Sequence, residues 1–426
     1  MIFKELVRKR NELLGPAYRL FYDEPLHIVR GQGVWLFAED GSKYLDMYNN
    51  VPHVGHCHPR VVEAIARQAS LLNTHTRYLH EHVVNYAGRL TGKCPNDLDT
   101  VMFCCTGSEA NELALRIARA ASGGEGIIVT DYAYHGNTRA TYEISTDDCP
   151  EELRPPHVAT VPNPDCYRGR YQGDDAGARY AEHVQEAVET LLARGIKPAA
   201  FLIDTIISSG GVVAPAPGYL ARCAEIIRAA GGLFIADEVQ PGFGRTGKHF
   251  WGFEADGLVP DLMTLGKPMG NGHPTAGVVA QRKYVEAFSN IDNYFNTFGG
   301  NPVSCAAALA VLDVIEDEEL QQNAAKTGDY MVAGLESLAE YHQLIGDVRG
   351  NGLFVAVELV ADRESQLPAT AATRKIVNDL RHRGVLTSSI GQDNNILKFR
   401  PPMVIAEAEV DLMLEALDAS LSALAS

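Results

Sequence analysis

Two apolar runs, each followed by a charged residue, decide the fold of this chain: Leu233-Phe234-Ile235-Ala236-Asp237-Glu238 and Leu262-Met263-Thr264-Leu265-Gly266-Lys267-Pro268. A short apolar run that is bounded by turn-forming residues is typical of a buried strand. Asp237 ends the first run, and Lys267 follows the second, thirty residues after Asp237. The pattern therefore places a carboxylate at one strand end and a lysine amine at the next.

Strand and helix patterns alternate on both sides of these two runs. The strand candidates are Thr100–Cys104, Gly126–Thr130, Ala199–Ile203, Gly232–Ala236, Leu262–Leu265 and Thr275–Ala280. The helix candidates are Val61–Leu72, Glu81–Leu90, Glu109–Ala121, Ala178–Arg194, Gly218–Ala230 and Val303–Ile315. Such alternation predicts an α/β fold with a mostly parallel sheet that is covered by helices on both faces.

The two ends of the chain have a different pattern. Residues 1–60 open with a short helix and continue as a β-hairpin around Gly33–Phe37 and Lys43–Asp46. After residue 320, helices and strands mix in an α+β order. We therefore expect a large domain over residues 61–320, and a smaller domain that combines residues 1–60 with the C-terminal α+β region, residues 321–426.

Composition excludes several classes of partner. The chain has 426 residues, of which 46% are apolar and 21% charged, and its formal charge of −17 disfavours nucleic acid and anionic membranes as main partners. No apolar run is long enough to span a bilayer, and the first fifteen residues lack the apolar block of a signal peptide. The eight cysteines are scattered without CxxC spacing, which indicates free thiols in a reducing cytoplasm.

A lysine and a carboxylate at adjacent strand ends are what a pyridoxal phosphate enzyme requires. The lysine binds the cofactor aldehyde as a Schiff base, and the carboxylate keeps the pyridine nitrogen protonated. The alternative is that Lys267 and Asp237 are two ordinary charged residues that follow buried strands.

Two loops add to the cofactor interpretation. Gly107 and Ser108 open a helix after a strand and suit a phosphate group, although an ordinary helix cap has the same pattern. Tyr134 follows the next strand and suits stacking on a ring, although on the loop alone an ordinary tyrosine-rich loop is the better explanation.

Two further motifs do not indicate a site. The run Gly242-Phe243-Gly244-Arg245-Thr246-Gly247 has the letters of a dinucleotide-binding motif, but it does not join a strand directly to a helix. The run Gly55-His56-Cys57-His58-Pro59 looks like a metal cluster, but adjacent residues cannot all reach one ion. We therefore expect no nucleotide site and no metal site.

Taken in order, the motifs resemble the class III aminotransferase family of fold type I pyridoxal phosphate enzymes, over nearly the whole chain. They are Gly41 with Tyr44–Asp46, Gly55–Pro59, Thr106–Asn111, Tyr134–Gly136, Asp237–Gln240 with Gly242–Gly247, Lys267 and Thr297–Pro302. The passages Tyr48–Val51, His53–Pro59, Gly247–Trp251, Gly266–Pro274, Tyr294–Thr297 and Gly299–Cys305 are similar to its lyase branch, the ethanolamine-phosphate phospho-lyases.

The resemblance implies a role for each matching residue. Lys267 takes the place of the lysine that binds the cofactor and moves the substrate proton, and Asp237 that of the partner of the pyridine nitrogen. The other implied cofactor contacts are Gly107, Ser108, Tyr134, Gln240 and Thr297. Thr297 is implied to come from a neighbouring subunit, so the resemblance implies a homodimer.

The sequence departs from the aminotransferase pattern at two places. Lys398 stands where aminotransferases of this class have an arginine that grips the substrate carboxylate, and Arg400 lies two residues on, on the same side of a strand. A lysine cannot reproduce the planar arginine fork, which favours a substrate without an α-carboxylate, and a change from arginine to lysine without functional meaning is the alternative. Asp204 begins a run in which aminotransferases have Glu-Pro. Arg77 lies where the resemblance implies that a partner subunit lines the site, and it is a candidate ligand of a substrate phosphate, with an ordinary surface arginine at a helix start as the alternative.

These observations predict a pyridoxal phosphate enzyme that eliminates phosphate from phosphoethanolamine. An aminotransferase that moves an amino group to a 2-oxo acid is the alternative, and a non-catalytic cofactor-binding protein is a third. The sequence leaves open whether dimers pair into tetramers.

Overall fold

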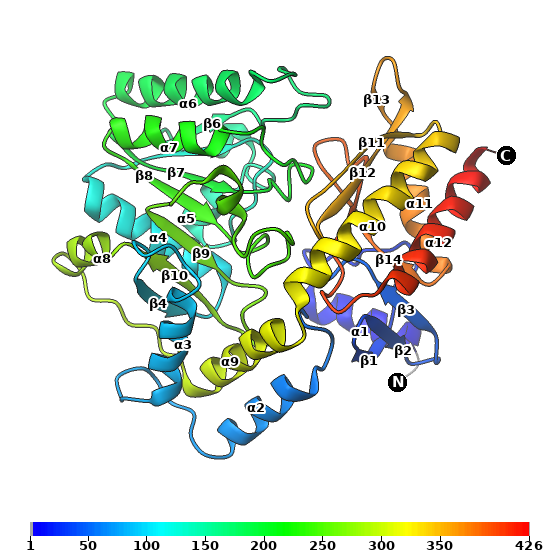
Figure 1. Cartoon of the computed structure of the whole chain (residues 1–426), viewed down its shortest axis with the longest axis horizontal. Coiled ribbons are helices and arrows are strands. Elements are labelled where there is room, and N and C mark those ends of the chain that lie inside the picture. The colour runs from blue at the N-terminus through cyan, green and yellow to red at the C-terminus, as the bar shows by residue number, and fades with distance from the viewer. Residues whose placement is uncertain (1–2, 426) are drawn as a thin grey trace.

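The computed structural model describes residues 3–425, so residues 1–2 and 426 of the predicted domains lie outside the described part. Figure 1 shows two bodies side by side: a large α/β body around one sheet, and a smaller body in which the first strands of the chain lie beside its last helices. The long helices α9 (Pro302–Asp317) and α10 (Leu320–Tyr341) follow each other from the large body into the small one.

The large body is built on a sheet of seven strands in the order β4-β10-β9-β8-β7-β5-β6. Neighbours from β9 to β6 run parallel, whereas β10 is antiparallel to both β4 and β9. The strands are β4 (Thr100–Cys104), β5 (Gly126–Thr130), β6 (Val158–Val161), β7 (Pro198–Asp204), β8 (Leu233–Asp237), β9 (Leu262–Leu265) and β10 (Ala276–Ala280).

Helices cover both faces of this sheet because successive side chains of each buried strand point to opposite sides. On β8, Phe234 packs into one core cluster with α6 and α7, while Ile235 packs into the other with α4 and α8. The helices of the large body are α2 (Pro59–Ala69), α3 (Glu81–Thr91), α4 (Gly107–Ser122), α5 (Arg139–Glu143), α6 (Ala176–Ala193), α7 (Tyr219–Ala229), α8 (Arg282–Ser289) and α9, with short 3₁₀ turns at Glu151–Leu153 and Gly252–Asp256.

The small body has two sheets. One has the order β1-β2-β3-β14, in which β14 (Val385–Leu386) pairs in parallel with β3 (Lys43–Asp46) and so joins the two ends of the chain. The other has the order β11-β12-β16-β15, with β13 paired to β12. The remaining elements are α1 (Phe3–Leu14), β1 (Ile28–Gln32), β2 (Trp35–Ala38), β11 (Ile345–Gly350), β12 (Val355–Asp362), β13 (Leu367–Pro368), α11 (Thr370–His382), β15 (Ser388–Ile390), β16 (Ile396–Phe399) and α12 (Glu407–Ala425).

The predicted α/β class and the mostly parallel central sheet are confirmed. The predicted strand at 275–280 exists as β10, but its direction is reversed, which an apolar run alone does not encode. The sequence patterns missed β1, β6 and α8, which are short: β6 has four residues and lies close to prolines on both sides.

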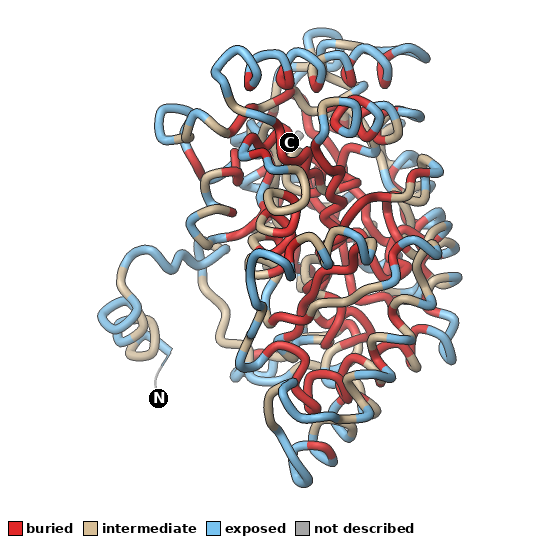
Figure 2. Tube along the Cα trace, turned by 90° about the vertical axis from the view of Figure 1, so that its left-hand side faces the viewer, coloured by how far each residue is buried: buried red, intermediate tan, exposed pale blue. Residues whose placement is uncertain are grey.

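Burial is concentrated along the sheet, as the tube in Figure 2 shows, and α1 projects from the body with no buried residue. Among the described residues, no helix is both long and apolar enough to cross a membrane.

The pairing of residues between neighbouring strands places charged groups at one edge of the sheet. Asp204 at the end of β7 pairs with Asp237 at the end of β8, and Asp237 pairs with Thr264 on β9. Lys267 follows β9 by two residues. The predicted placement of a carboxylate and an amine at adjacent strand ends is therefore realised at the carboxyl edge of the parallel strands.

A close approach between α10 and the turn that joins β11 to β12 gives a stability prediction. A Cβ on Gly328 of α10 would lie 2.2 Å from the carbonyl oxygen of Gly352, so the main chain must shift. We expect Gly328→Ala to destabilise the fold by about 1–3 kcal/mol, measured by urea unfolding. Gly88 of α3 has open space around its Cα, so the control Gly88→Ala should stabilise by up to about 1 kcal/mol through helix propensity. Equal effects of the two substitutions would contradict this packing argument.

Candidate active site

The Asp237 carboxylate is buried at the end of β8 and is held by three donors. Asn111 Nδ2 lies 2.9 Å and His135 Nδ1 2.7 Å from Oδ2, while the Val239 amide donates to Oδ1 over 3.1 Å. Burial raises the pKa of this carboxyl, but the His135 and Asn111 contacts and the Val239 amide outweigh it, so the pKa lies below its ordinary value. Asp237 is therefore a buried group that stays charged at neutral pH.

Thr264 of β9 extends this network, because its hydroxyl donates to Asn111 Oδ1 over 2.6 Å. Asn111 also donates to the carbonyl of His135 over 2.8 Å, so the loop after β5 and the first turns of α4 are fixed together. The sequence patterns included Asn111 and His135 in their motifs but gave them no role. A polar residue on the buried side of α4 was the signal that could have found Asn111.

The N-terminus of α4 presents free amide donors. Thr106 and Glu109 cap this helix: the Thr106 side chain accepts from the Glu109 amide, and the Glu109 carboxylate accepts from the Cys105 and Thr106 amides. Within the described residues, the amides of Gly107 and Ser108 have no acceptor. A Cβ on Gly107 would meet Val239 Cγ1 at 3.0 Å, so glycine lets these elements approach closely. Such a helix terminus is an anion-binding arrangement.

Lys267 lies directly after β9 and faces a cavity of about 1050 Å³ between the two bodies. Burial lowers the pKa of its amine, the nearby Arg400 guanidinium lowers it further, and the carboxylates of Asp237 and Asp204 partly oppose both. A lysine with a lowered pKa is a better nucleophile and base at neutral pH than an exposed one.

The cavity brings together five of the predicted site residues, which are far apart in the sequence: Tyr134, Gln240, Lys267, Lys398 and Arg400. It does not include Asp237, Gly107 or Ser108 in its wall.

Other cavity residues come from segments to which the sequence patterns assigned no site. They include Arg19 and Phe21 before β1, Tyr48 after β3, Ser209 after β7, and Arg374 of α11.

Lys398 and Arg400 lie on the small-body side of this cavity, and no carboxylate forms a salt bridge with either within the described residues. Arg400 donates to Gln240 Oε1 and to Asn50 Oδ1, and its Nε has no partner. Lys398 Nζ donates to the carbonyl of Ser208 over 2.5 Å. Burial and the neighbouring Arg400 lower the pKa of Lys398 well below its ordinary value. Both basic groups thus lack an anionic partner.

Arg77 and Thr297 are exposed and lie outside this cavity. The Arg77 guanidinium stacks over the Phe295 ring at 3.8 Å. The single chain therefore does not bring these two predicted residues to the others.

The two rejected motifs are parts of the scaffold. His56 Nε2 lies 2.7 Å from Asp46 Oδ2, and His58 Nε2 lies 3.1 Å from Glu318 Oε1. Within the described residues no group of three His, Cys, Asp or Glu side chains is arranged to hold a metal. In the glycine-rich loop Arg245 is fully buried and donates to the carbonyls of Leu353 and Pro401 over 3.1 and 2.7 Å.

The model of the family described as "Aminotransferase class-III" matches residues 21–421. The chain belongs to this family.

Its relatives carry two kinds of name. The chain is 44% identical to "Alanine--glyoxylate aminotransferase 2-like" of Drosophila melanogaster, over 96% of this chain and 85% of the relative. It is 37% identical to "Ethanolamine-phosphate phospho-lyase homolog 1" of Caenorhabditis elegans, over 97% of this chain and 92% of the relative. The solved structure of a phospholyase from Arthrobacter in complex with phosphoethanolamine superposes with a TM-score of 0.94, at 43% identity, and covers 98% of this chain and 99% of that one.

The family's cofactor is pyridoxal 5'-phosphate, which solved structures of similar chains contain. The residues of this chain fit that group. The free amides at the start of α4 suit its phosphate, the charged Asp237 suits a protonated ring nitrogen, and the cavity exposes the Lys267 amine.

The electrostatic effect of Arg400 on Lys267 predicts that cofactor capture depends on pH differently when Arg400 is replaced. Replacing Arg400 by Gln removes a positive charge near Lys267, so the pKa of Lys267 should rise. The absorbance of the cofactor-free protein with added pyridoxal phosphate reports capture of the cofactor at each pH. The pH range in which capture occurs should then move to higher values. The control is Arg374→Gln, because Arg374 lines the same cavity but pairs with Asp23. A profile that Arg400→Gln leaves unchanged would refute the electrostatic coupling.

Proposed function

We propose that this protein is a pyridoxal phosphate-dependent lyase that eliminates phosphate from O-phosphoethanolamine. The observation that carries the proposal is the pair of basic side chains, Lys398 and Arg400, which face the cavity without an anionic partner. A phosphate dianion supplies that partner through charge-assisted hydrogen bonds. The Arthrobacter phospholyase with bound phosphoethanolamine and the worm phospho-lyase homolog support the same substrate class.

Pyridoxal phosphate, when bound, supplies a ring that withdraws electrons from the Cα of the substrate. Lys267 holds the cofactor and then removes the Cα proton, a task that its lowered pKa favours. Asp237 holds a proton on the ring nitrogen, because its own carboxylate stays charged. Gly107 and Ser108 would hold the cofactor phosphate, Tyr134 would pack against the ring, and Gln240 would contact its oxygen.

Lys398 and Arg400 bind the substrate phosphate and stabilise it as it leaves. The Cα–H bond breaks, its electron pair forms a Cα–Cβ double bond, and the Cβ–O bond breaks with its pair on the departing phosphate. Water hydrolyses the released enamine to acetaldehyde and ammonia.

The proposal includes a homodimer. Arg77 stacks on Phe295, two residues before the exposed Thr297, and large apolar side chains next to them in the sequence are exposed, among them Tyr78, Leu79 and Phe298. Exposed apolar surface of this kind marks interaction sites. We propose that a second copy covers these residues, so that Thr297 reaches the cofactor phosphate and Arg77 the substrate phosphate of the partner site. The cytoplasmic location expected from the cysteines stays a prediction.

An aminotransferase is the second candidate, because the 44% identical fly relative carries that name. The two reactions share the cofactor, the lysine and the first proton transfer. They differ in the next step: an aminotransferase returns the proton to the cofactor and needs a 2-oxo acid, whereas the lyase expels phosphate.

Incubation of the purified holoenzyme with phosphoethanolamine, without any oxo acid, tests the proposal. We expect stoichiometric phosphate and acetaldehyde from the wild-type protein and neither from Lys267→Ala. Accumulation of pyridoxamine phosphate from another amine, with no phosphate released, would instead favour the aminotransferase.

The role of Lys398 gives a separate prediction. We expect Lys398→Met to raise KM for phosphoethanolamine about tenfold or more, the cost of a lost hydrogen bond to a charged group. In the wild-type enzyme KM should rise with pH, because Lys398 loses its proton at a lower pH than an ordinary lysine. Lys398→Met should lack that step. The matched control is Lys326→Met, since Lys326 pairs with Glu407 on the surface. An unchanged KM in Lys398→Met would remove this residue from the phosphate site.

A further inference from the structure

The loop of residues 205–212, which leaves the end of β7, forms part of the cavity wall. Its Ser208 carbonyl accepts the hydrogen bond of Lys398 Nζ, and Ser209 lines the cavity. The Ser208 amide donates to Asp204 Oδ2 over 2.9 Å, and the Ser208 hydroxyl donates to the same oxygen. The position of this loop therefore sets where the Lys398 ammonium lies relative to the sheet edge.

The loop adopts a conformation that its sequence disfavours. Ile207 and Val212 have φ values of 46° and 55°, in the left-handed region where a β-branched residue is strained. A residue in this region persists only where the surroundings hold it. The Val212 amide donates to the Ile207 carbonyl over 3.0 Å, which closes the loop but leaves the carbonyls of Gly211 and Val212 to be satisfied elsewhere.

Arg349 of β11 satisfies both carbonyls. Its Nη2 donates to the Gly211 carbonyl over 2.8 Å, and its Nε lies 3.1 and 3.2 Å from the carbonyl oxygens of Gly211 and Val212. A Cβ on Gly211 would lie 3.2 Å from Arg349 Nη2 and 3.0 Å from Ile396, so glycine permits this close contact. Arg349 thus ties the loop to the small body, together with Lys398 Nζ on the Ser208 carbonyl and the Gly391 amide, which donates to the Ser209 carbonyl over 3.3 Å.

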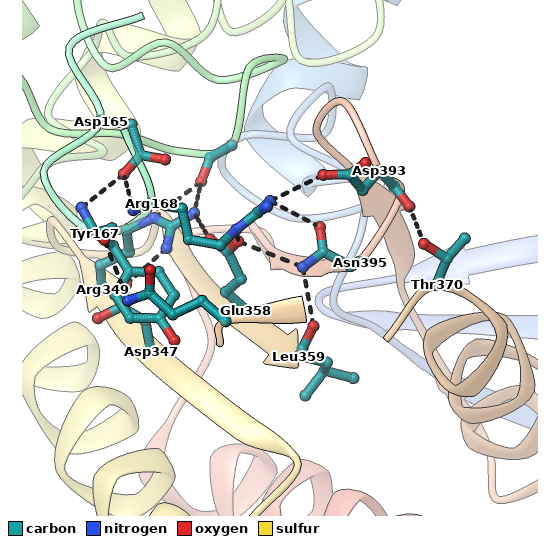
Figure 3. A network of polar contacts seen from close by, with 12 residues as sticks. Asp165, Tyr167, Arg168, Asp347, Arg349, Glu358, Leu359, Thr370, Asp393 and Asn395 are labelled. Atoms are coloured by element: carbon teal, nitrogen blue, oxygen red, sulfur yellow. Dashed lines mark hydrogen bonds and ion pairs between the residues drawn. The ribbon is translucent and has the colours of Figure 1, made fainter. Parts of the chain in front are cut away.

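Carboxylates in turn fix Arg349, as Figure 3 shows. Its Nη1 donates to Asp347 over 2.6 Å, and its Nη2 forms an ion pair with the buried Glu358 at 2.9 Å. Glu358 also binds Arg168 and accepts from Asn395 Nδ2 over 3.3 Å. Arg168 comes from the large body and Glu358 from β12, so one carboxylate connects both bodies to the arginine that holds the loop.

Apolar contacts keep the same loop against the same sheet. Ile206 and Val212 form a small buried cluster with Phe354, Ala356 and Ile396 of the small body. Contact with an apolar surface fixes the distance between the loop and the sheet, and the directional Arg349 hydrogen bonds fix its orientation.

We infer that Arg349 is a positioning residue: by holding the carbonyls of Gly211 and Val212, it orients the Ser208 carbonyl that places the Lys398 ammonium at the phosphate end of the cavity. The inference rests on the proposed function only for the ligand of Lys398. It assigns part of the specificity for a phosphorylated amine to a side chain outside the cavity wall.

Crystal structures of the holoenzyme variants test the positioning directly. In Arg349→Gln we expect the loop to move and the contact between Lys398 Nζ and the Ser208 carbonyl to be lost. Arg349→Lys keeps the charge beside Glu358 but not the planar fork, so it should fold and show the same displacement. The matched control is Arg363→Gln: Arg363 also binds main-chain carbonyls, three of them, at the far end of β11, without touching the loop. An unmoved loop with an intact Lys398 contact in both Arg349 variants overturns the inference.

A double-mutant cycle tests the route through Lys398. In the wild-type background, Arg349→Lys should raise KM for phosphoethanolamine about tenfold, comparable to one misplaced charge-assisted hydrogen bond, with the cofactor absorbance unchanged. In the Lys398→Met background it should add little, because the group that it positions is gone. Additive effects overturn the route. If the wild-type enzyme releases no phosphate, the proposed function fails, and the crystal structures still decide the positioning role.

Discussion

A buried, charged carboxylate at the carboxyl edge of the central sheet is the constraint on which the site depends. Burial raises the pKa of Asp237, and the chain outweighs this with donors from α4, from the loop after β5 and from the second residue after β8. Those donors fix the relative positions of the three elements that surround the cofactor site. The free amides at the start of α4 and the Lys267 amine after β9 take their places from the same arrangement.

The opposite side of the cavity carries basic side chains. Lys398 and Arg400 are carried by the small body, and neutral oxygens rather than carboxylates hold both of them. Burial of a positive group is unfavourable, and it lowers the pKa values of Lys267, Lys398 and Arg400. An anionic ligand would relieve this cost, and this is the basis on which we propose a phosphate-bearing substrate. Arg349 and the network of hydrogen bonds and ion pairs around Glu358 connect the small-body wall of the cavity to the loop that leaves the sheet edge.

Much of this arrangement could be predicted from the sequence because it depends on local patterns. Apolar runs located most of the central strands, and the charged residues after two of them located Lys267 and Asp237. The strand pattern around Lys398 and Arg400 correctly indicated two side chains that share one side. Features that depend on tertiary structure were not accessible in this way. The reversed direction of β10, the partners of Asp237 and the path from Arg349 to Ser208 all arise between segments far apart in the chain. Arg77 and Thr297 show a further limit, since one chain does not bring them to the cavity and their proposed role depends on a second copy.

The central claim is that Lys398 and Arg400 receive a phosphate group in this cavity. A crystal structure of the Lys267→Ala holoenzyme with phosphoethanolamine measures this most directly, because substrate binds there without turnover. We predict phosphate oxygens within hydrogen-bond distance of Lys398 Nζ and the Arg400 guanidinium, with the substrate amine directed to the cofactor. A substrate phosphate that lies in solvent, with both basic groups still on Ser208 and Gln240, would contradict this claim.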